Sequence, residues 1–185
     1  MSTVTINNSP VHSDIVVTNP YGVYNPNYKC DFHTGIDFAP TGSTIANPIM
    51  YSVCVGEVVE VTYTNALGYQ VLIKDTDNRY WRYCHMLTTS PRSVGDQVNT
   101  STIVGIMGSS GNSTGVHLHL EYATTASWNC STFKDPADKL GIPNVTGTIV
   151  KYDGSAPPPT PPTPAGEIKR KFPWFIYARK FRSRY

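Results

Sequence analysis

The chain has 185 residues, enough for one domain with a buried core and an appendage. Hydrophobic residues make up 39% and charged residues 15%, and the 15 Pro and 14 Gly leave few helix formers, which favours a mainly β fold. No apolar run is long enough to span a membrane as a helix. We also expect no signal peptide, because residues 1–17 lack a basic start followed by an apolar core.

Short β-rich runs separated by turn residues occupy the middle of the chain. They predict strands at 51–61, 69–75, 79–86, 102–108 and 115–122. No long segment has a 3.6-residue hydrophobic period, but one short helix is predicted at 135–141. Asp135 can cap its first turn, Pro136 can occupy that turn and Gly141 can end the helix. These elements predict a compact antiparallel β-sheet domain with short loops.

The net charge of +2 hides an uneven distribution along the chain. The last twenty residues carry seven basic residues and one acidic residue, a net of +6, whereas residues 1–165 carry a net of −4. Parts of opposite charge commonly have different roles. We therefore place a folded domain at 1–150, a proline-rich, semi-rigid linker at 151–166 and a basic aromatic tail at 167–185.

The C-terminal tail interleaves its cations with aromatic side chains. This pattern suits an anionic surface, such as a wall polymer or the outer face of a membrane. Nucleic acid would be attracted only non-specifically by the same charge, so we expect no specific nucleic-acid partner. A disordered, solubilising end without a ligand is the alternative.

The four cysteines, at positions 30, 54, 84 and 130, lack the C-x-x-C pairing of a structural zinc ribbon. We expect reduced thiols in the newly made protein and a disulfide only after release into an oxidising medium. Cys30 and Cys84 lie close in sequence to His33 and His85, so a Cys/His zinc site is an alternative. Their spacing matches no ordinary structural zinc pattern.

The stretch GVHLHLEY, residues 115–122, places two histidines one residue apart. In a strand, His117, His119 and Glu121 would share one face, and the two leucines between them would share the other. The histidines could bind a metal, transfer protons or satisfy local hydrogen bonds. Glu121 could orient an imidazole or remain a solvated carboxylate. The preceding GSSGNSTG is predicted to be a tight loop that delivers this strand to the site.

A second motif, DFHTGIDFAP, places His33 and Asp37 four residues apart. Gly35 and Pro40 argue against a helix, so a strand or loop is predicted there. A hydrolytic zinc site needs about three protein ligands and an open position for water. His33, Asp37 and one histidine of the H-x-H pair would supply such a set. His85 and the other histidine would then be left for proton transfer and charge stabilisation.

Several motifs in the same order resemble the lysostaphin-type, or LytM-like, zinc endopeptidases, which cut peptide cross-links of bacterial peptidoglycan. The resemblance runs from about residue 19 to residue 140 and includes NPYGVY, HTGIDFAPTGSTI, GEVVEV, LGYQVLIKD, YCHM, VGDQV, GSSGNSTGVHLHLEY and DPADKL. It implies one zinc ion per chain, held by His33, Asp37 and His119. It also implies that His85 and His117 are catalytic histidines that do not bind the metal.

The family also has a tyrosine that helps to stabilise the transition state, and the resemblance assigns this role to Tyr24. Tyr21, Tyr28 or plain packing are alternatives to that assignment. Many relatives carry an arginine soon after the PYG-like element, and none stands between Gly22 and His33 here. We therefore expect the substrate loops of this chain to differ from those of its relatives.

The resemblance implies a zinc-dependent endopeptidase that acts on cross-links or stem peptides of peptidoglycan. A catalytically inactive wall-binding or virion structural module is the alternative. Because no signal peptide is expected, we expect a phage or prophage lysin made in the host cytoplasm. It would reach the cell wall by holin-type release or as part of a virion. The residues do not distinguish a glycyl-glycine bond from one that involves D-alanine.

Overall fold

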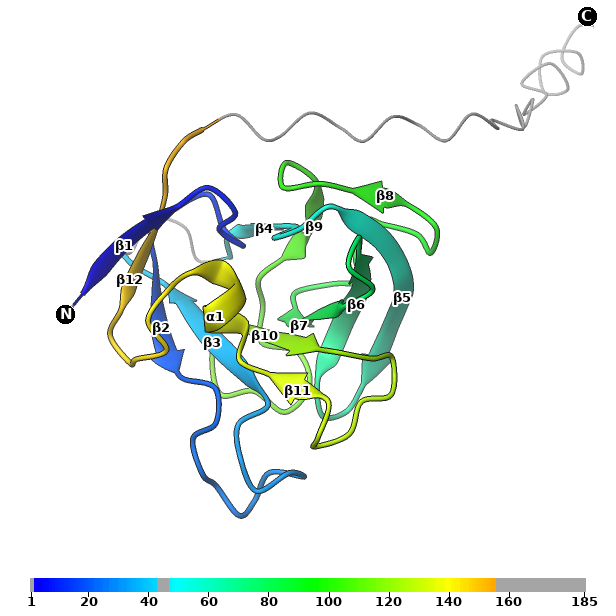
Figure 1. The fold of residues 1–185 in the computed structure, drawn as a ribbon, viewed down its shortest axis with the longest axis horizontal. Coiled ribbons are helices and arrows are strands. Elements are labelled where there is room, and N and C mark those ends of the chain that lie inside the picture. The colour runs from blue at the N-terminus through cyan, green and yellow to red at the C-terminus, as the bar shows by residue number, and fades with distance from the viewer. Residues whose placement is uncertain (1, 43–46, 156–185) are drawn as a thin grey trace, which may run out of the picture.

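The computed structural model describes residues 2–42 and 47–155 of the chain. Within these ranges the chain forms twelve strands and one short helix (Figure 1). The strands are β1 Thr3–Ile6, β2 Ile15–Asn19, β3 Gly35–Pro40, β4 Ile49–Tyr51, β5 Gly56–Thr64, β6 Gly68–Asp75, β7 Tyr80–Met86, β8 Gln97–Val98, β9 Ile103–Ile106, β10 Leu118–Ala123, β11 Phe133–Lys134 and β12 Ile149–Tyr152. The helix α1 spans Pro136–Leu140. The prediction of a mainly β fold is confirmed.

The C-terminal boundaries predicted from composition fall near the end of the described residues. Strand β12 continues to Tyr152, two residues beyond the predicted end of the domain. The remainder of the linker after Ser155 and the whole basic tail lie outside the described residues. No helix in 2–42 or 47–155 is long and apolar enough to cross a membrane.

One large sheet contains most of the strands. Its order is β1-β12-β2-β3-β10-β7-β6-β5-β8, with β11 paired to β10. Neighbouring strands are antiparallel, except for the parallel pair β1 and β12. The other two strands, β4 and β9, form a small antiparallel sheet. This order places β3, β10 and β7 side by side in the middle of the large sheet, and they carry or border the predicted site residues.

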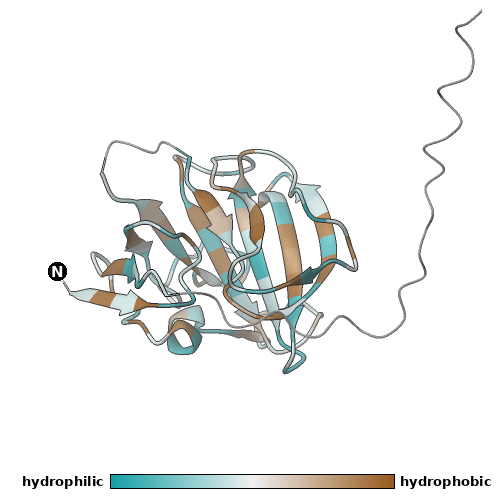
Figure 2. Ribbon diagram, turned by 90° about the horizontal axis from the view of Figure 1, so that it is seen from above, coloured by the Kyte–Doolittle hydropathy of each residue, from teal (hydrophilic) through white to brown (hydrophobic). Residues whose placement is uncertain are grey.

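The alternation of side chains along β10 separates the core from the site. Leu118 and Leu120 are fully buried in the core, and burial of each stabilises the fold by roughly 1.5–3 kcal/mol. His119 and Glu121 alternate with the leucines, so they point to the opposite face and line a cavity there. Figure 2 shows hydrophobic and hydrophilic residues alternating along strands of the sheet. The predicted two-faced strand is confirmed.

The small sheet and the helix pack against the large sheet. A Cβ atom on Gly105 of β9 would come within 2.8 Å of the Met86 sulfur of β7, so the two sheets are in close contact at this point. Helix α1 contacts β3 and β10. Its start and end are as predicted: the Asp135 side chain accepts a hydrogen bond from the Ala137 N–H, and Gly141 ends the helix with a φ of 69°.

A disulfide between Cys30 and Cys130 connects two loops that are 100 residues apart in sequence. One loop joins β2 to β3 and the other joins β10 to β11. The bond corresponds to the oxidised state, which we expect only after release into an oxidising medium. Its Cα atoms are 5.4 Å apart, a separation that folding produces and that the linear sequence does not reveal. Cys54 and Cys84 remain free.

Candidate active site

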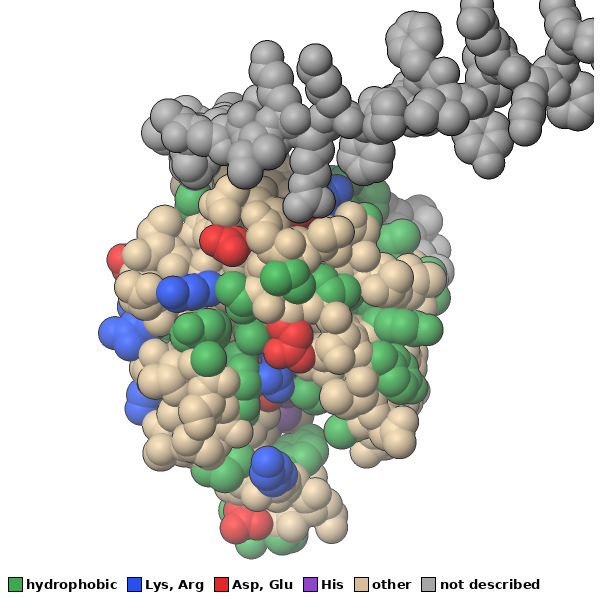
Figure 3. Space-filling model, turned by 90° about the vertical axis from the view of Figure 1, so that its right-hand side faces the viewer, with side chains coloured by type: hydrophobic (Ala, Val, Ile, Leu, Met, Phe, Trp, Pro, Cys, Tyr) green, Lys and Arg blue, Asp and Glu red, His purple; other side chains and the backbone are tan. Residues whose placement is uncertain are grey.

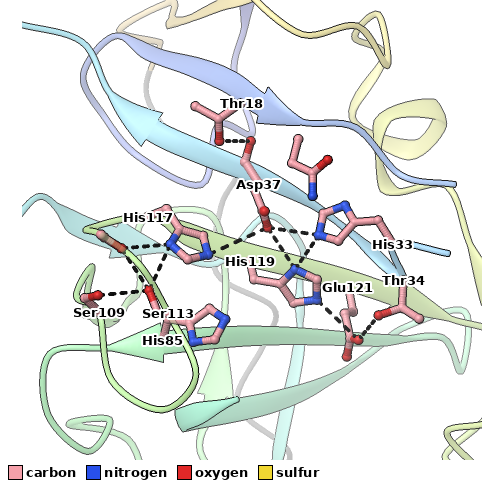
Figure 4. A network of polar contacts seen from close by, with 12 residues as sticks. Thr18, His33, Thr34, Asp37, His85, Ser109, Ser113, His117, His119 and Glu121 are labelled. Carbon is pink, nitrogen blue, oxygen red and sulfur yellow. Dashed lines mark hydrogen bonds and ion pairs between the residues drawn. The ribbon is translucent and has the colours of Figure 1, made fainter. Parts of the chain in front are cut away.

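Two adjacent strands bring three predicted metal ligands together (Figure 4). Asp37 of β3 and His119 of β10 are direct partners in the antiparallel ladder, and His33 lies two residues before β3. Asp37 Oδ1 is 2.8 Å from His119 Nδ1 and 3.2 Å from His33 Nε2. One ligand atom from each residue lies within 4.8 Å of the others. Two imidazoles and a carboxylate that converge in this way are a suitable ligand set for zinc.

The backbone holds Nδ1 of His33, the ring nitrogen on the side away from Asp37 and His119. His33 Nδ1 is 2.9 Å from the carbonyl oxygen of Pro20, which can only accept a hydrogen bond, so the N–H is at Nδ1. In the neutral ring, the lone pair is then on Nε2, the atom that faces Asp37 and His119. The chain therefore fixes both the orientation and the tautomer that a metal ligand needs. No cysteine belongs to the ligand cluster found among the described residues, so they do not form the alternative Cys/His site.

The buried carboxylate of Glu121 lies next to Nε2 of His119, the ring nitrogen that does not face Asp37. Glu121 is only 2% exposed, and its Oε1 is 3.3 Å from His119 Nε2, although not in line for a hydrogen bond. The hydroxyl of Thr34 donates to the same oxygen at 2.7 Å. Arg82 of β7 donates from Nη1 to Glu121 Oε2 at 3.2 Å. Of the two roles considered for Glu121, the structure supports orientation of an imidazole rather than solvation.

These contacts determine the charges of the cluster. Burial by itself would raise the pKa of Asp37, but the close contacts with His119 and His33 outweigh it and hold the pKa well below its usual range. Burial would likewise lower the pKa of His119, but the contacts to Asp37 and Glu121 raise it to about 9. Burial of Glu121 is outweighed in the same way by His119 and Arg82, which lower the pKa of this carboxyl. The protein thus holds two ionised carboxylates next to His119.

His85 reaches the site because β7 is irregular at that point. The pairing of β6 with β7 shifts register between Tyr69 and Val71, and His85 has a φ of +57°, which is rare for a residue with a side chain. Its Nδ1 donates to the Ser110 carbonyl oxygen at 2.8 Å, so the lone pair of the neutral ring is on Nε2. Burial, and to a lesser extent the neighbouring His117, lower the pKa of His85 to about 4. His85 is therefore neutral at pH 7.

His117 is held in a similar way, just before β10. Its Nδ1 is 2.9 Å from the carbonyl oxygen of Gly115 and 3.3 Å from the hydroxyl of Ser113. Its Nε2 is 3.9 Å from Asp37 Oδ1, farther than the nitrogens of the two ligand histidines. The ring centroids of His117 and His85 are 4.7 Å apart. These two histidines form a pair beside the cluster of His33, Asp37 and His119 and do not belong to it.

All five of these residues, His33, Asp37, His85, His117 and His119, line one cavity of about 680 Å³. Figure 3 shows a hollow on one face of the molecule, with histidine visible inside it and basic and acidic side chains along its edges. A cavity of this size can accept several residues of a peptide. The structure therefore brings together in one cavity all the residues predicted as metal ligands or catalytic histidines.

Tyr24 does not join this cavity. A short hairpin pairs the backbone around Val23 with that around His33. Tyr24 lies on this hairpin and is 74% exposed. Tyr28, one of the alternatives, lines the cavity instead, with its ring centroid 5.7 Å from that of His33. Asn19 Nδ2 donates to the Tyr28 hydroxyl at 3.4 Å. The structure thus places Tyr28, rather than Tyr24, close to the predicted metal ligands.

Several residues that position the site were not found from the sequence. Ser110 and Ser113 contact His85 and His117, and both serines belong to GSSGNSTG, which was predicted only as a loop. Thr34 sits within the HTGID motif, so a polar residue beside two expected ligands was the available signal. Arg82 and Trp128 gave no signal, because their contact joins β7 to the loop after β10.

Comparison with known proteins identifies relatives of the same fold and motifs. A family model, Peptidase family M23, matches residues 31–130. Lysostaphin of Staphylococcus simulans is 32% identical over 135 residues, which are 70% of this chain and 26% of lysostaphin. The glycyl-glycine endopeptidase ALE-1 of Staphylococcus capitis is 32% identical over 119 residues, which are 63% of this chain and 31% of that protein.

Solved structures give the same result. The catalytic domain of lysostaphin from Staphylococcus simulans superposes with a TM-score of 0.58 at 28% identity, covering 70% of this chain and 92% of that domain. A mutant catalytic domain of the prophage-encoded M23 protein EnpA from Enterococcus faecalis gives a TM-score of 0.52 at 38% identity, covering 66% of this chain and 88% of that domain. The chain spans about a third or less of the length of lysostaphin and ALE-1. Because the family model matches more than half of the chain, the lysostaphin-type family predicted from the sequence is confirmed, and the chain belongs to peptidase family M23.

Proposed function

We propose that this chain is a zinc-dependent endopeptidase that hydrolyses peptide bonds in the cross-links or stem peptides of bacterial peptidoglycan. The observation that carries the proposal is the position of His85 and His117 beside the ligand cluster, with their Nδ1 atoms held by backbone carbonyls. The name of ALE-1, a glycyl-glycine endopeptidase, supports a peptide bond as the point of attack. The complete set of ligands and histidines favours an enzyme over an inactive wall-binding module.

His33, Asp37 and His119 would hold the zinc ion. When bound, zinc polarises the scissile carbonyl and lowers the pKa of a coordinated water to about 7. Glu121 and the Pro20 carbonyl keep the two imidazoles oriented while the reaction proceeds.

The two remaining histidines would move the protons. His85 is neutral at pH 7, and its lone pair on Nε2 can accept a proton from the attacking water. His117 has its Nε2 on the Asp37 side of the same cavity, and in its protonated form, with an N–H on both ring nitrogens, it can hydrogen-bond the developing oxyanion. The opposite division of these roles would need a proton on His85 Nε2, which the lowered pKa of His85 disfavours. Tyr28 is the tyrosine best placed to assist them.

The proposed biological setting is a phage or prophage lysin that acts on the cell wall. The prophage-encoded relative EnpA supports this setting. The basic tail at 167–185 would concentrate the enzyme on an anionic wall polymer or membrane. A chain that ends at Ser155 should then cleave a small soluble peptide as well as the full chain does, but sediment less with cell walls at low salt. Equal sedimentation of both chains over a range of salt would contradict this role of the tail.

Purified protein and isolated cell walls test the enzymatic proposal directly. Elemental analysis should find one zinc ion per chain, and the protein should reduce the turbidity of a wall suspension. Mass spectrometry of the released fragments should then show new amino and carboxyl ends at one type of peptide bond. Release of fragments by breakage of glycosidic bonds alone would overturn the proposal, as would full peptide cleavage by protein that contains no divalent metal.

A further inference from the structure

His85 lies in a bulge of strand β7. Two residues of β7, Cys84 and His85, lie opposite the single residue Gln70 of β6. His85 also has a φ of +57°, which is unfavourable for a residue with a Cβ atom. Bulges occur often beside active sites, where they turn one side chain of a strand in a new direction. The contacts that hold this bulge therefore determine where the His85 ring points.

The hydroxyl of Ser110 links the two strands at this bulge. It donates a hydrogen bond to the Met86 carbonyl oxygen at 2.6 Å and accepts one from the Tyr69 N–H at 3.0 Å. Met86 and Tyr69 are partners across β7 and β6, and Met86 directly follows His85 in the chain. The hydroxyl thus fixes the backbone on the C-terminal side of His85.

The backbone carbonyl of Ser110 holds the ring of His85. Its oxygen accepts a hydrogen bond from Nδ1 at 2.8 Å. On the N-terminal side of the bulge, the His85 N–H donates to the Leu67 carbonyl oxygen at 2.9 Å. One residue, Ser110, therefore contacts both the ring of His85 and the backbone that directs this ring.

Two glycines allow Ser110 to lie so close to β6. A Cβ atom on Gly68 would overlap the hydroxyl and carbonyl oxygens of Ser110, and one on Gly111 would overlap the backbone nitrogen of Gly68. Both glycines have left-handed φ angles, +66° and +75°, which other residues rarely adopt. The Asn112 N–H also donates to the Ala66 carbonyl oxygen at 3.1 Å. The loops 65–67 and 107–117 thus pack backbone against backbone, which leaves Ser110 little freedom to move.

We infer that Ser110 is a positioning residue, which holds the β7 bulge so that the His85 ring lies in the cavity with Nε2 free. The inference rests on the proposed function, because it takes His85 as the group that accepts a proton from water. Ser110 itself does not line the cavity, so it acts through His85. A displacement of about 1 Å can lower the rate of a reaction about 100-fold, which is why this contact matters for turnover.

The variant Ser110→Ala removes the hydroxyl but keeps the carbonyl that holds the ring. In the zinc-loaded full chain we expect kcat on a soluble cross-linked peptide fragment of peptidoglycan to fall about 10- to 100-fold. KM and zinc content should stay near those of the wild type, because Ser110 neither lines the cavity nor belongs to the ligand cluster. Ser93→Ala, at an exposed serine away from the cavity, is the matched control and should keep the wild-type kcat.

A spectroscopic measurement separates positioning of the ring from stability of the fold. Nitrogen NMR of the His85 ring reports which ring nitrogen carries the proton, and its signals are assigned by their absence from His85→Ala. The zinc-loaded wild type should show the proton on Nδ1, because this atom donates to Ser110. In Ser110→Ala the ring is held less firmly, so we expect a mixture of the two tautomers.

The variant Gly111→Ala tests the same role without the loss of a hydrogen-bonding group. The added Cβ atom would displace the loop that carries Ser110, so kcat and the His85 signals should change as in Ser110→Ala. Gly154→Ala is the matched control. Gly154 has a similar φ of +73°, but a Cβ atom there would meet nothing within 4 Å. This control should keep the wild-type kcat, which separates the contact with Gly68 from backbone strain alone.

The outcomes for Ser110 and for the proposed function can be separated. Wild-type kcat and unchanged His85 signals in both Ser110→Ala and Gly111→Ala would overturn the positioning role. A loss of kcat with unchanged His85 signals would overturn it as well. If the signals change in both variants but the wild type cleaves no peptide, Ser110 still positions His85 and the proposed function fails. Cleavage by the wild type together with unchanged variants leads to the opposite conclusion.

Discussion

His119 and Asp37 are direct partners across strands β10 and β3, and the register of these strands sets the 2.8 Å distance between His119 Nδ1 and Asp37 Oδ1. The two residues are 82 positions apart in sequence. A shift of one residue in either strand would turn one of the side chains to the other face of the sheet. The antiparallel pairing of β3 with β10 is therefore a condition for the metal site.

Asp37→Ala should remove zinc and activity together, because it deletes the one carboxylate among the three ligands. We expect the zinc content of the purified variant to fall well below one ion per chain and wall hydrolysis to be lost. Elemental analysis and a turbidity assay measure the two quantities. Asp138→Ala, in the first turn of α1, is the matched control and should keep both. An Asp37→Ala variant with full zinc content would show that this carboxylate is not a ligand.

His85→Ala and His117→Ala should keep the metal but lose turnover. Proton transfer by a positioned side chain contributes about 10²–10⁴-fold to the rate, so we expect kcat to fall within that range for each variant. Zinc content should remain near that of the wild type, because neither residue belongs to the ligand cluster. Loss of zinc in His117→Ala would mean that the roles of His117 and His119 are exchanged.

Tyr28→Phe and Tyr24→Phe test which tyrosine acts in the cavity. Removal of the Tyr28 hydroxyl should lower kcat by about tenfold or more, since a donor aimed at developing negative charge contributes several kcal/mol at most. The exposed Tyr24 does not line the cavity, so Tyr24→Phe should leave kcat unchanged. Steady-state kinetics on one soluble peptide compare the variants. The reverse order of effects would support the assignment made from sequence resemblance.

Glu121→Ala should weaken both zinc binding and the fold. The loss of a carboxylate that orients a ligand histidine reduces metal affinity about 10- to 100-fold. The nearly buried Arg82 would also lose its ion-pair partner, which we expect to cost roughly 3 kcal/mol of unfolding free energy. Competition with a chelator and urea denaturation measure the two effects. Glu57→Ala, at an exposed carboxylate of β5, should change both quantities little.

Zinc binding should release a proton from His119 near neutral pH. In protein stripped of metal by a chelator, the raised pKa of about 9 keeps His119 protonated at pH 7. The stabilisation from this charged group is complete below the ordinary histidine pKa of about 6.5 and is lost as the pH rises through 9. A metal ligand must be neutral, so zinc affinity should rise about tenfold per pH unit from 7 to 9 and then level off. Chelator competition that gives a constant affinity over this interval would contradict the charge state derived for His119.

The sequence predicted the elements whose signals are local. The alternation of histidine and leucine in β10 and the cap, proline and glycine of α1 are each complete within a few residues, and the structure contains both. The nearby clustering of polar residues in HTGID and in the H-x-H strand likewise indicated the ligands. The predicted two-faced strand is present because side-chain direction in a strand follows directly from its period of two, whereas the ligand assignment stays a prediction.

Features that depend on distant contacts could not be predicted. The register shift that turns His85 into the cavity arises from the pairing of β6 with β7. Tyr28, rather than Tyr24, reaches the site because a hairpin fixes which side chain folds inward. The Arg82–Glu121 pair and the Cys30–Cys130 disulfide join residues far apart in sequence. Each of these depends on the assembled sheet and its loops, for which a single sequence offers no local pattern.

The bond between Cys30 and Cys130 makes the intervening backbone a closed covalent ring. The ring contains all the proposed ligands and catalytic histidines, since these run from His33 to His119. A single protease cut at any place within it leaves one molecule, with the fragments still linked through the two sulfur atoms. The same cut after reduction produces two separate chains, and a cut between His33 and His119 places these two residues on different chains. The oxidised protein can thus lose the continuity of its backbone without separating the two halves of its active site.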